Sequence, residues 1–73
     1  MNISDLKIIA KNGGGMIIDA KKISPADLKV IALNASGTQA NIIIKNPHVI
    51  HSADLKLIAR NSNGCVIFDF FDI

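Results

Sequence analysis

The side chains that could ligate a metal ion fall into two short pairs, His48 with His51 and Asp69 with Asp72. The members of each pair are three residues apart, which can bring two ligands together. Zinc sites, however, need three or four ligands in a convergent geometry. Next to Pro47, the two histidines are as well suited to capping and turn contacts. We therefore expect no metal site and no cofactor.

Two further features could serve catalysis, a single cysteine and a run of glycines. Cys65 opens an apolar segment and has no basic neighbour in the sequence, which is typical of an inert core thiol rather than a nucleophile. Gly13-Gly14-Gly15 precedes a β-prone segment, whereas a loop that cradles phosphate precedes the N-terminus of a helix. We therefore predict no catalytic residues and expect that the protein is not an enzyme.

Five cationic residues recur on predicted helices and could form one basic stripe: Lys7, Lys11, Lys29, Lys56 and Arg60. If the helices lie side by side, this stripe could face nucleic acid or an acidic protein. The other interpretation is that these side chains are simply solvated. The chain has no Tyr or Trp to stack on bases, which nucleic-acid-binding surfaces commonly use. Nucleic-acid binding is therefore the alternative hypothesis.

The elements that would position these side chains are indicated by an eight-residue motif, Asp-Leu-Lys-x-Ile-Ala-x-Asn. Such self-similarity indicates that one supersecondary unit is used several times, because a single unit cannot bury its own apolar face. The motif occurs at residues 5–12, 27–34 and 54–61. The predicted units are residues 1–22, 23–49 and 50–73, all within one domain.

Each motif copy predicts an amphipathic helix with a capping residue in front of it. Asn2 and Ser24 are the first two candidate caps. In the third copy His51 holds the equivalent position but is a poor cap, so the cap is either His51 or Ser52, which would shift the helix start by one residue. An apolar residue before each cap could pack on the motif leucine as a hydrophobic staple. The predicted staples are Met1 with Leu6, Ile23 with Leu28, and Ile50 with Leu55.

The motif also predicts how the helices pack and where they end. Its Leu, Ile and Ala form one apolar stripe, and the alanines Ala10, Ala32 and Ala59 would let neighbouring helices approach closely. Asn tolerates the left-handed conformation that ends helices, and small residues follow it in each copy. The helices are therefore expected to end at Asn12, Asn34 and Asn61.

A short β-prone run follows each loop, at residues 16–19, 41–45 and 65–70. Helix, turn and strand, used three times, give an α/β fold of order αβαβαβ. Strands joined by helices run parallel. The short period is compatible with a compact αβ solenoid or with a pseudo-threefold prism, and the sequence does not decide between them.

Length and composition set the remaining bounds. A 73-residue chain buries only about 60% of its unfolded surface, and one cysteine cannot form an internal disulfide. The N-terminus lacks the pattern of a signal peptide, and no apolar run reaches the roughly 18 residues of a membrane span. We expect a cytoplasmic protein that does not act at a membrane.

The apolar C-terminal strand suggests how the chain functions. In residues 65–71 both alternating sets are largely hydrophobic, as in a strand that is covered on both sides. Three helices on one side of a sheet would leave the other side in need of a partner. We predict a small protein-interaction or regulatory module that binds itself as a homodimer, or another protein, through Phe68, Phe70 and Phe71. The alternative is that these rings fill the core of a monomer.

Overall fold

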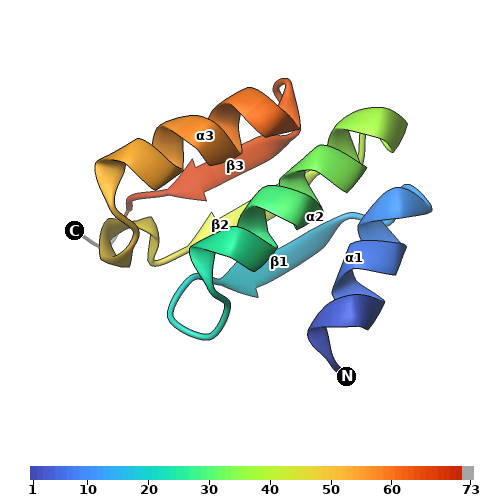
Figure 1. Cartoon of the computed structure of the whole chain (residues 1–73), viewed down its shortest axis with the longest axis horizontal. Coiled ribbons are helices and arrows are strands. Elements are labelled where there is room, and N and C mark those ends of the chain that lie inside the picture. Colours follow the sequence, from blue (N-terminus) through green and yellow to red (C-terminus); the bar gives the residue numbers. More distant parts are fainter. Residues whose placement is uncertain (72–73) are drawn as a thin grey trace.

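The computed structural model describes residues 1–71 and shows helices and strands in alternation (Figure 1). The helices are α1 (Ile3–Lys11), α2 (Pro25–Thr38) and α3 (Ser52–Ser62), and the strands are β1 (Met16–Asp19), β2 (Ile42–Lys45) and β3 (Val66–Asp69). A short 3₁₀ helix, Pro47–Val49, precedes α3. The predicted α/β class and the order of elements are confirmed. None of the described helices has the length and hydropathy needed to cross a membrane.

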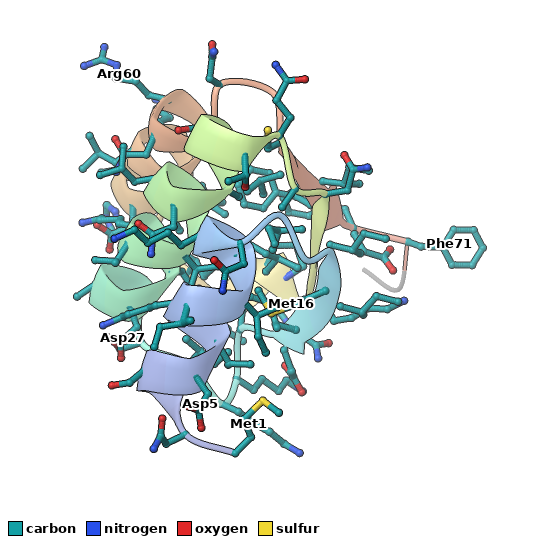
Figure 2. All side chains as sticks on the ribbon, turned by 90° about the vertical axis from the view of Figure 1, so that its right-hand side faces the viewer. Met1, Asp5, Met16, Asp27, Arg60 and Phe71 are labelled. Atoms are coloured by element: carbon teal, nitrogen blue, oxygen red, sulfur yellow. The ribbon has the colours of Figure 1, made fainter. Side chains whose placement is uncertain are left out.

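The three strands form one parallel sheet in the order β1-β2-β3. Equivalent residues pair across it, so that Met16 lies opposite Ile42 and Ile42 opposite Val66. All three helices pack on the same side of the sheet, with α2 between α1 and α3 (Figures 1 and 2). Within the described residues the sheet therefore has two open edges, β1 and β3, and one open face.

The N-terminal caps of α1 and α2 are those that the sequence predicts. The Asn2 side chain accepts a hydrogen bond from the Asp5 amide at 3.0 Å, and Asp5 Oδ2 accepts one from the Asn2 amide at 3.4 Å. Ser24 accepts from the Asp27 amide at 3.3 Å. Of the two candidates for the third cap, His51 rather than Ser52 caps α3. A neutral imidazole can accept a hydrogen bond, and His51 Nδ1 does so from the Ala53 amide.

The C-termini of the helices depart further from the prediction. Asn12 ends α1 as expected, but α2 continues past Asn34 to Thr38 and ends at Gln39, which has a φ of 59°. The reason is a tertiary contact. The side-chain amide of Asn34 donates a hydrogen bond to the backbone oxygen of Lys7 on α1, at 3.0 Å. Helix α3 likewise runs one residue beyond the expected end, and its cap is Asn63.

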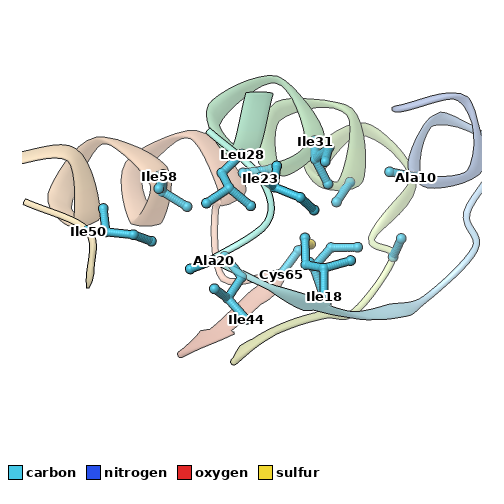
Figure 3. Packing of buried hydrophobic residues seen from close by; sticks show 14 residues of the cluster. Ala10, Ile18, Ala20, Ile23, Leu28, Ile31, Ile44, Ile50, Ile58 and Cys65 are labelled. Carbon is cyan, nitrogen blue, oxygen red and sulfur yellow. The ribbon is translucent and has the colours of Figure 1, made fainter. Parts of the chain in front are cut away.

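The core lies between the helix layer and the sheet (Figure 3). Leu28, Ile31 and Ile58 of the helices and Ile42 and Ile44 of β2 are its largest fully buried side chains. On α2 the predicted apolar stripe of the motif is buried in full, whereas on α3 its alanine, Ala59, is exposed. One staple is absent, because Met1 is 93% exposed, whereas Ile23 and Ile50 are buried.

Candidate interaction surfaces

The open face of the sheet carries a row of three isoleucines. Side chains alternate along a strand, and the register places Ile17 opposite Ile43 and Ile43 opposite Ile67. Ile17 is 67% exposed and Ile67 is 54% exposed, whereas Ile42 on the helix side is fully buried. The strands are therefore apolar on both sides, as predicted, but covered on only one.

A polar row lies beside the isoleucines at the carboxyl ends of the strands. Asp19, Lys45 and Asp69 occupy equivalent positions and lie side by side across the sheet. The Lys45 ammonium donates to Asp69, and the Asn46 amide donates to Asp19 at 2.9 Å. The Asn46 hydrogen bond lowers the pKa of Asp19, and the Lys45 hydrogen bond lowers that of Asp69. Both carboxylates are therefore ionised at neutral pH.

This polar row borders a hollow of about 300 Å³. Parallel sheets commonly bind ligands beyond the carboxyl ends of their strands, so the hollow is a natural place to look for chemistry. His48 also lines it, but no hydrogen bond described in residues 1–71 joins His48 to a carboxylate. In the same part of the chain no three His, Cys or Asp side chains are placed to hold a metal ion. Asp72 lies outside the described residues.

The three predicted interface phenylalanines have different surroundings. Phe68 is half-buried and packs against the core, and its ring centroid lies 6.2 Å from that of Phe70. Phe70 is 43% exposed. Phe71 is 91% exposed and projects from the side of the sheet opposite the helices (Figure 2). Of the three rings, only that of Phe71 is almost fully exposed.

Two of the five residues in the predicted basic stripe are engaged in ion pairs between helices. Lys7 Nζ of α1 lies 3.0 Å from Asp27 Oδ1 of α2. Lys29 Nζ of α2 lies 2.9 Å from Asp54 Oδ1 of α3. The repeated Asp-Leu-Lys supplies both partners of these pairs, but the pairs were not predicted because each lysine needs the aspartate of a neighbouring helix.

The other three residues of the predicted stripe are exposed: Lys11, Lys56 and Arg60. Lys56 and Arg60 flank a shallow hollow of about 390 Å³ on the outer side of α3, which Leu57 also lines. The structure thus separates the stripe into two lysines held between helices and three cations in contact with solvent. A continuous basic surface is not formed by all five.

Cys65 and the glycine run, the remaining candidates for chemistry, lie where they serve the fold. Cys65 is buried, with 8% of its surface exposed. Gly14 lies where the turn after α1 passes over the helix, and a Cβ there would come within 2.5 Å of Ile9 Cγ2. The glycine run therefore meets the steric demands of a tight turn.

Comparison with family models, with curated proteins and with solved structures found no match to this chain.

Proposed function

We propose that this chain is a small, non-catalytic protein-interaction module that self-associates through the open face of its sheet. The observation that carries the proposal is the isoleucine row, in which Ile17 and Ile67 leave more than half of their surface in water. Exposing apolar area costs roughly 25 cal/mol per Å². An apolar row aligned across three strands therefore favours covering by a second apolar surface.

We also infer that the domain is a short αβ array of three units, residues 1–22, 23–49 and 50–73. Support comes from the equivalent positions that the three motif copies occupy on α1, α2 and α3. An open solenoid is favoured over a prism because β1 and β3 are separated by β2 rather than paired with each other.

The charges on the open face favour a second copy in a particular orientation. If two faces met with their strands parallel about a twofold axis, Lys45 would face its own counterpart and Asp19 would face Asp69. Like charges placed directly opposite each other are unfavourable. With antiparallel strands, isoleucine row meets isoleucine row and the polar rows lie at opposite ends. We therefore propose the antiparallel, face-to-face pair.

The size of the face sets the strength of this association. Three strands of four residues, at about 4.8 Å between strands and about 3.3 Å per residue, cover on the order of 200 Å². Stable interfaces bury about 800 Å² per partner. The exposed ring of Phe71 enlarges the apolar surface at the β3 side. The pair is consequently expected to be weak and concentration-dependent.

The nucleic-acid alternative has less support. The pairing of Lys7 and Lys29 with aspartates removes two cations from the predicted stripe. Binding to a phosphate backbone is dominated by the number of cations that contact it, and the three exposed ones give a small site. A low-salt mobility shift with labelled RNA would revive this alternative.

Light scattering tests the self-association directly. The mass of the wild-type protein should rise over concentrations of about 10 μM to 1 mM, a range that covers weak dissociation constants. Ile17→Thr with Ile67→Thr keeps the β-branched shape but makes the row polar, and should hold the protein as a monomer. The matched control, Val30→Thr with Leu33→Gln, alters two exposed apolar residues of α2 and should associate like wild type. Equal behaviour of both variants would overturn the proposal.

A further inference from the structure

The two ion pairs between helices follow one rule. The lysine of the first motif copy pairs with the aspartate of the second, and the lysine of the second pairs with the aspartate of the third. This pattern leaves the motif aspartate of the first copy and the motif lysine of the third copy without a counterpart, one at each end of the helix layer. Asp5 stands at the outer side of α1, and Lys56 stands at the outer side of α3 without an ion pair in residues 1–71.

The alanines of the motif show that the same side of α3 lacks a neighbour. On α1 and α2, Ala10 and Ala32 are fully buried, on the flank from which the motif lysine reaches the next helix. On α3 the equivalent Ala59 is exposed. Lys56 of this flank also lines the hollow of about 390 Å³ on the outer side of α3. The flank has the features of a helix–helix contact, but none of residues 1–71 forms a helix against it.

At the opposite end of the helix layer, α1 also lacks a neighbouring helix on its outer side among residues 1–71. Ile31 and Ile58 are fully buried on α2 and α3, whereas the equivalent Ile9 of α1 remains partly exposed. The sheet ends in the same way, since among the described residues no strand pairs with the outer edge of β1 or of β3. Open edges of parallel strands offer backbone donors and acceptors to another strand.

We propose that a second copy docks head to tail, with its α1–β1 edge against the α3–β3 edge of the first. Lys56 of one molecule would pair with Asp5 of the next, as Lys29 pairs with Asp54 within the chain. Ala59 would be covered as Ala32 is. This contact is independent of the open sheet face. Because it joins two different surfaces, it generates a series of oligomers rather than a closed dimer.

One contact opposes this association and limits it. Continuing the sheet in register would place Asp69 of one molecule beside Asp19 of the next. Two carboxylates directly opposite each other are destabilising. The head-to-tail contact is therefore weak in the wild-type protein, and Asp69→Asn should strengthen it.

A charge-swap experiment tests the proposal. Lys56→Asp and Asp5→Lys are made in the Ile17→Thr/Ile67→Thr background, so that the open face does not contribute. Each variant alone places like charges at the contact and should associate at least about tenfold more weakly than its background. An equimolar mixture restores opposite charges and should recover the association. Light scattering at low salt is the readout.

Two controls keep the result interpretable. Lys56→Asp lowers the net charge from +2 to 0, and Lys11→Asp does the same at an exposed residue at the end of α1, one turn from Lys7 on the flank that faces α2 rather than the contact. Lys11→Asp should associate like its background. Asp5→Lys also removes the α1 capping box, so Asp5→Ala, which loses the same acceptor without adding a cation, is the matched control, and circular dichroism of both variants shows whether the fold survives. A mixture that associates no better than the separate folded variants overturns the head-to-tail contact and leaves the open-face proposal untouched.

Discussion

Lys29 Nζ lies 2.9 Å from Asp54 Oδ1, and this contact fastens α2 to α3 as Lys7 fastens α1 to α2. Both side chains are about 30% exposed, so water screens the pair only in part. The two pairs are placed by the same motif positions, and each spans from one helix to the next. The motif therefore contributes to the packing of neighbouring helices as well as to the helices themselves.

A double-mutant cycle should detect this coupling. Lys29→Ala and Asp54→Ala, singly and together, should give a coupling free energy of about 0.5 kcal/mol, in the range of partly screened surface pairs. Urea unfolding at low salt is the measurement, and high salt should reduce the coupling. A coupling of zero at low salt would mean that the pair does not hold the helices together.

The hydrogen bond between helices at Asn34 should also be measurable. Asn34→Ala removes the bond to the Lys7 carbonyl and should cost about 1 kcal/mol. This corresponds to a fall in Tm of roughly 4–8 °C for a domain of this size. The control is Asn12→Ala, the same change at the equivalent motif position, which is exposed and should have a smaller effect. Equal losses would contradict the interhelical role.

Two glycines in open space should respond in opposite directions to alanine. A Cβ at Gly37 or at Gly64 would meet no atom within 4 Å. Gly37 lies within α2, so Gly37→Ala should stabilise the protein by about 0.5–1 kcal/mol. Gly64 has a φ of +91°, where a side chain is strained, so Gly64→Ala should destabilise it. Thermal melts of the two variants check the signs.

The carboxylates with lowered pKa predict how stability depends on pH. Lys7 and then Ser24 lower the pKa of Asp27, and the groups described above lower those of Asp19 and Asp69. Their folded pKa values lie below the unfolded value of about 3.9, so the folded state binds fewer protons. The stabilisation is fully present above about pH 4 and is lost as the pH falls through the folded values.

Urea midpoints measured from neutral pH down to below the ordinary carboxyl pKa check this dependence. The midpoint should hold steady in the upper part of the range and fall in the acid part. Asp27→Asn should flatten part of that fall. A midpoint that stays constant or rises in acid would contradict the assigned ion pairs and hydrogen bonds.

Much of the fold could be predicted from the sequence because its signals are local. Caps such as Asn2 and Ser24 act within one turn, and the apolar stripe of the motif reports which side of a helix is buried. The end of α2 could not be predicted. An Asn at this position usually favours the end of a helix. Here the side-chain amide of Asn34 donates a hydrogen bond to the carbonyl of Lys7, 27 residues earlier, and the helix continues.

The candidate surfaces were predictable only in outline. The apolar C-terminal strand indicated an uncovered side, yet the grouping of Ile17, Ile43 and Ile67 into one row depends on the register between strands. Register is a property of paired strands and cannot be read from one of them. For the same reason, the row of Asp19, Lys45 and Asp69 could not be predicted from the sequence.

The most direct test of the open-face proposal is a dilution series followed by NMR of isoleucine methyl groups. Between about 1 mM and 10 μM, a range that spans weak association, the signals of Ile17, Ile43 and Ile67 should shift together. Those of the buried Ile42 and Ile44 should move less. This contrast is expected because the isoleucine row lies at the proposed contact, whereas Ile42 and Ile44 lie in the core. Shifts confined to Ile9 of α1 would assign association to the edges instead, and signals that do not change with concentration would contradict self-association altogether.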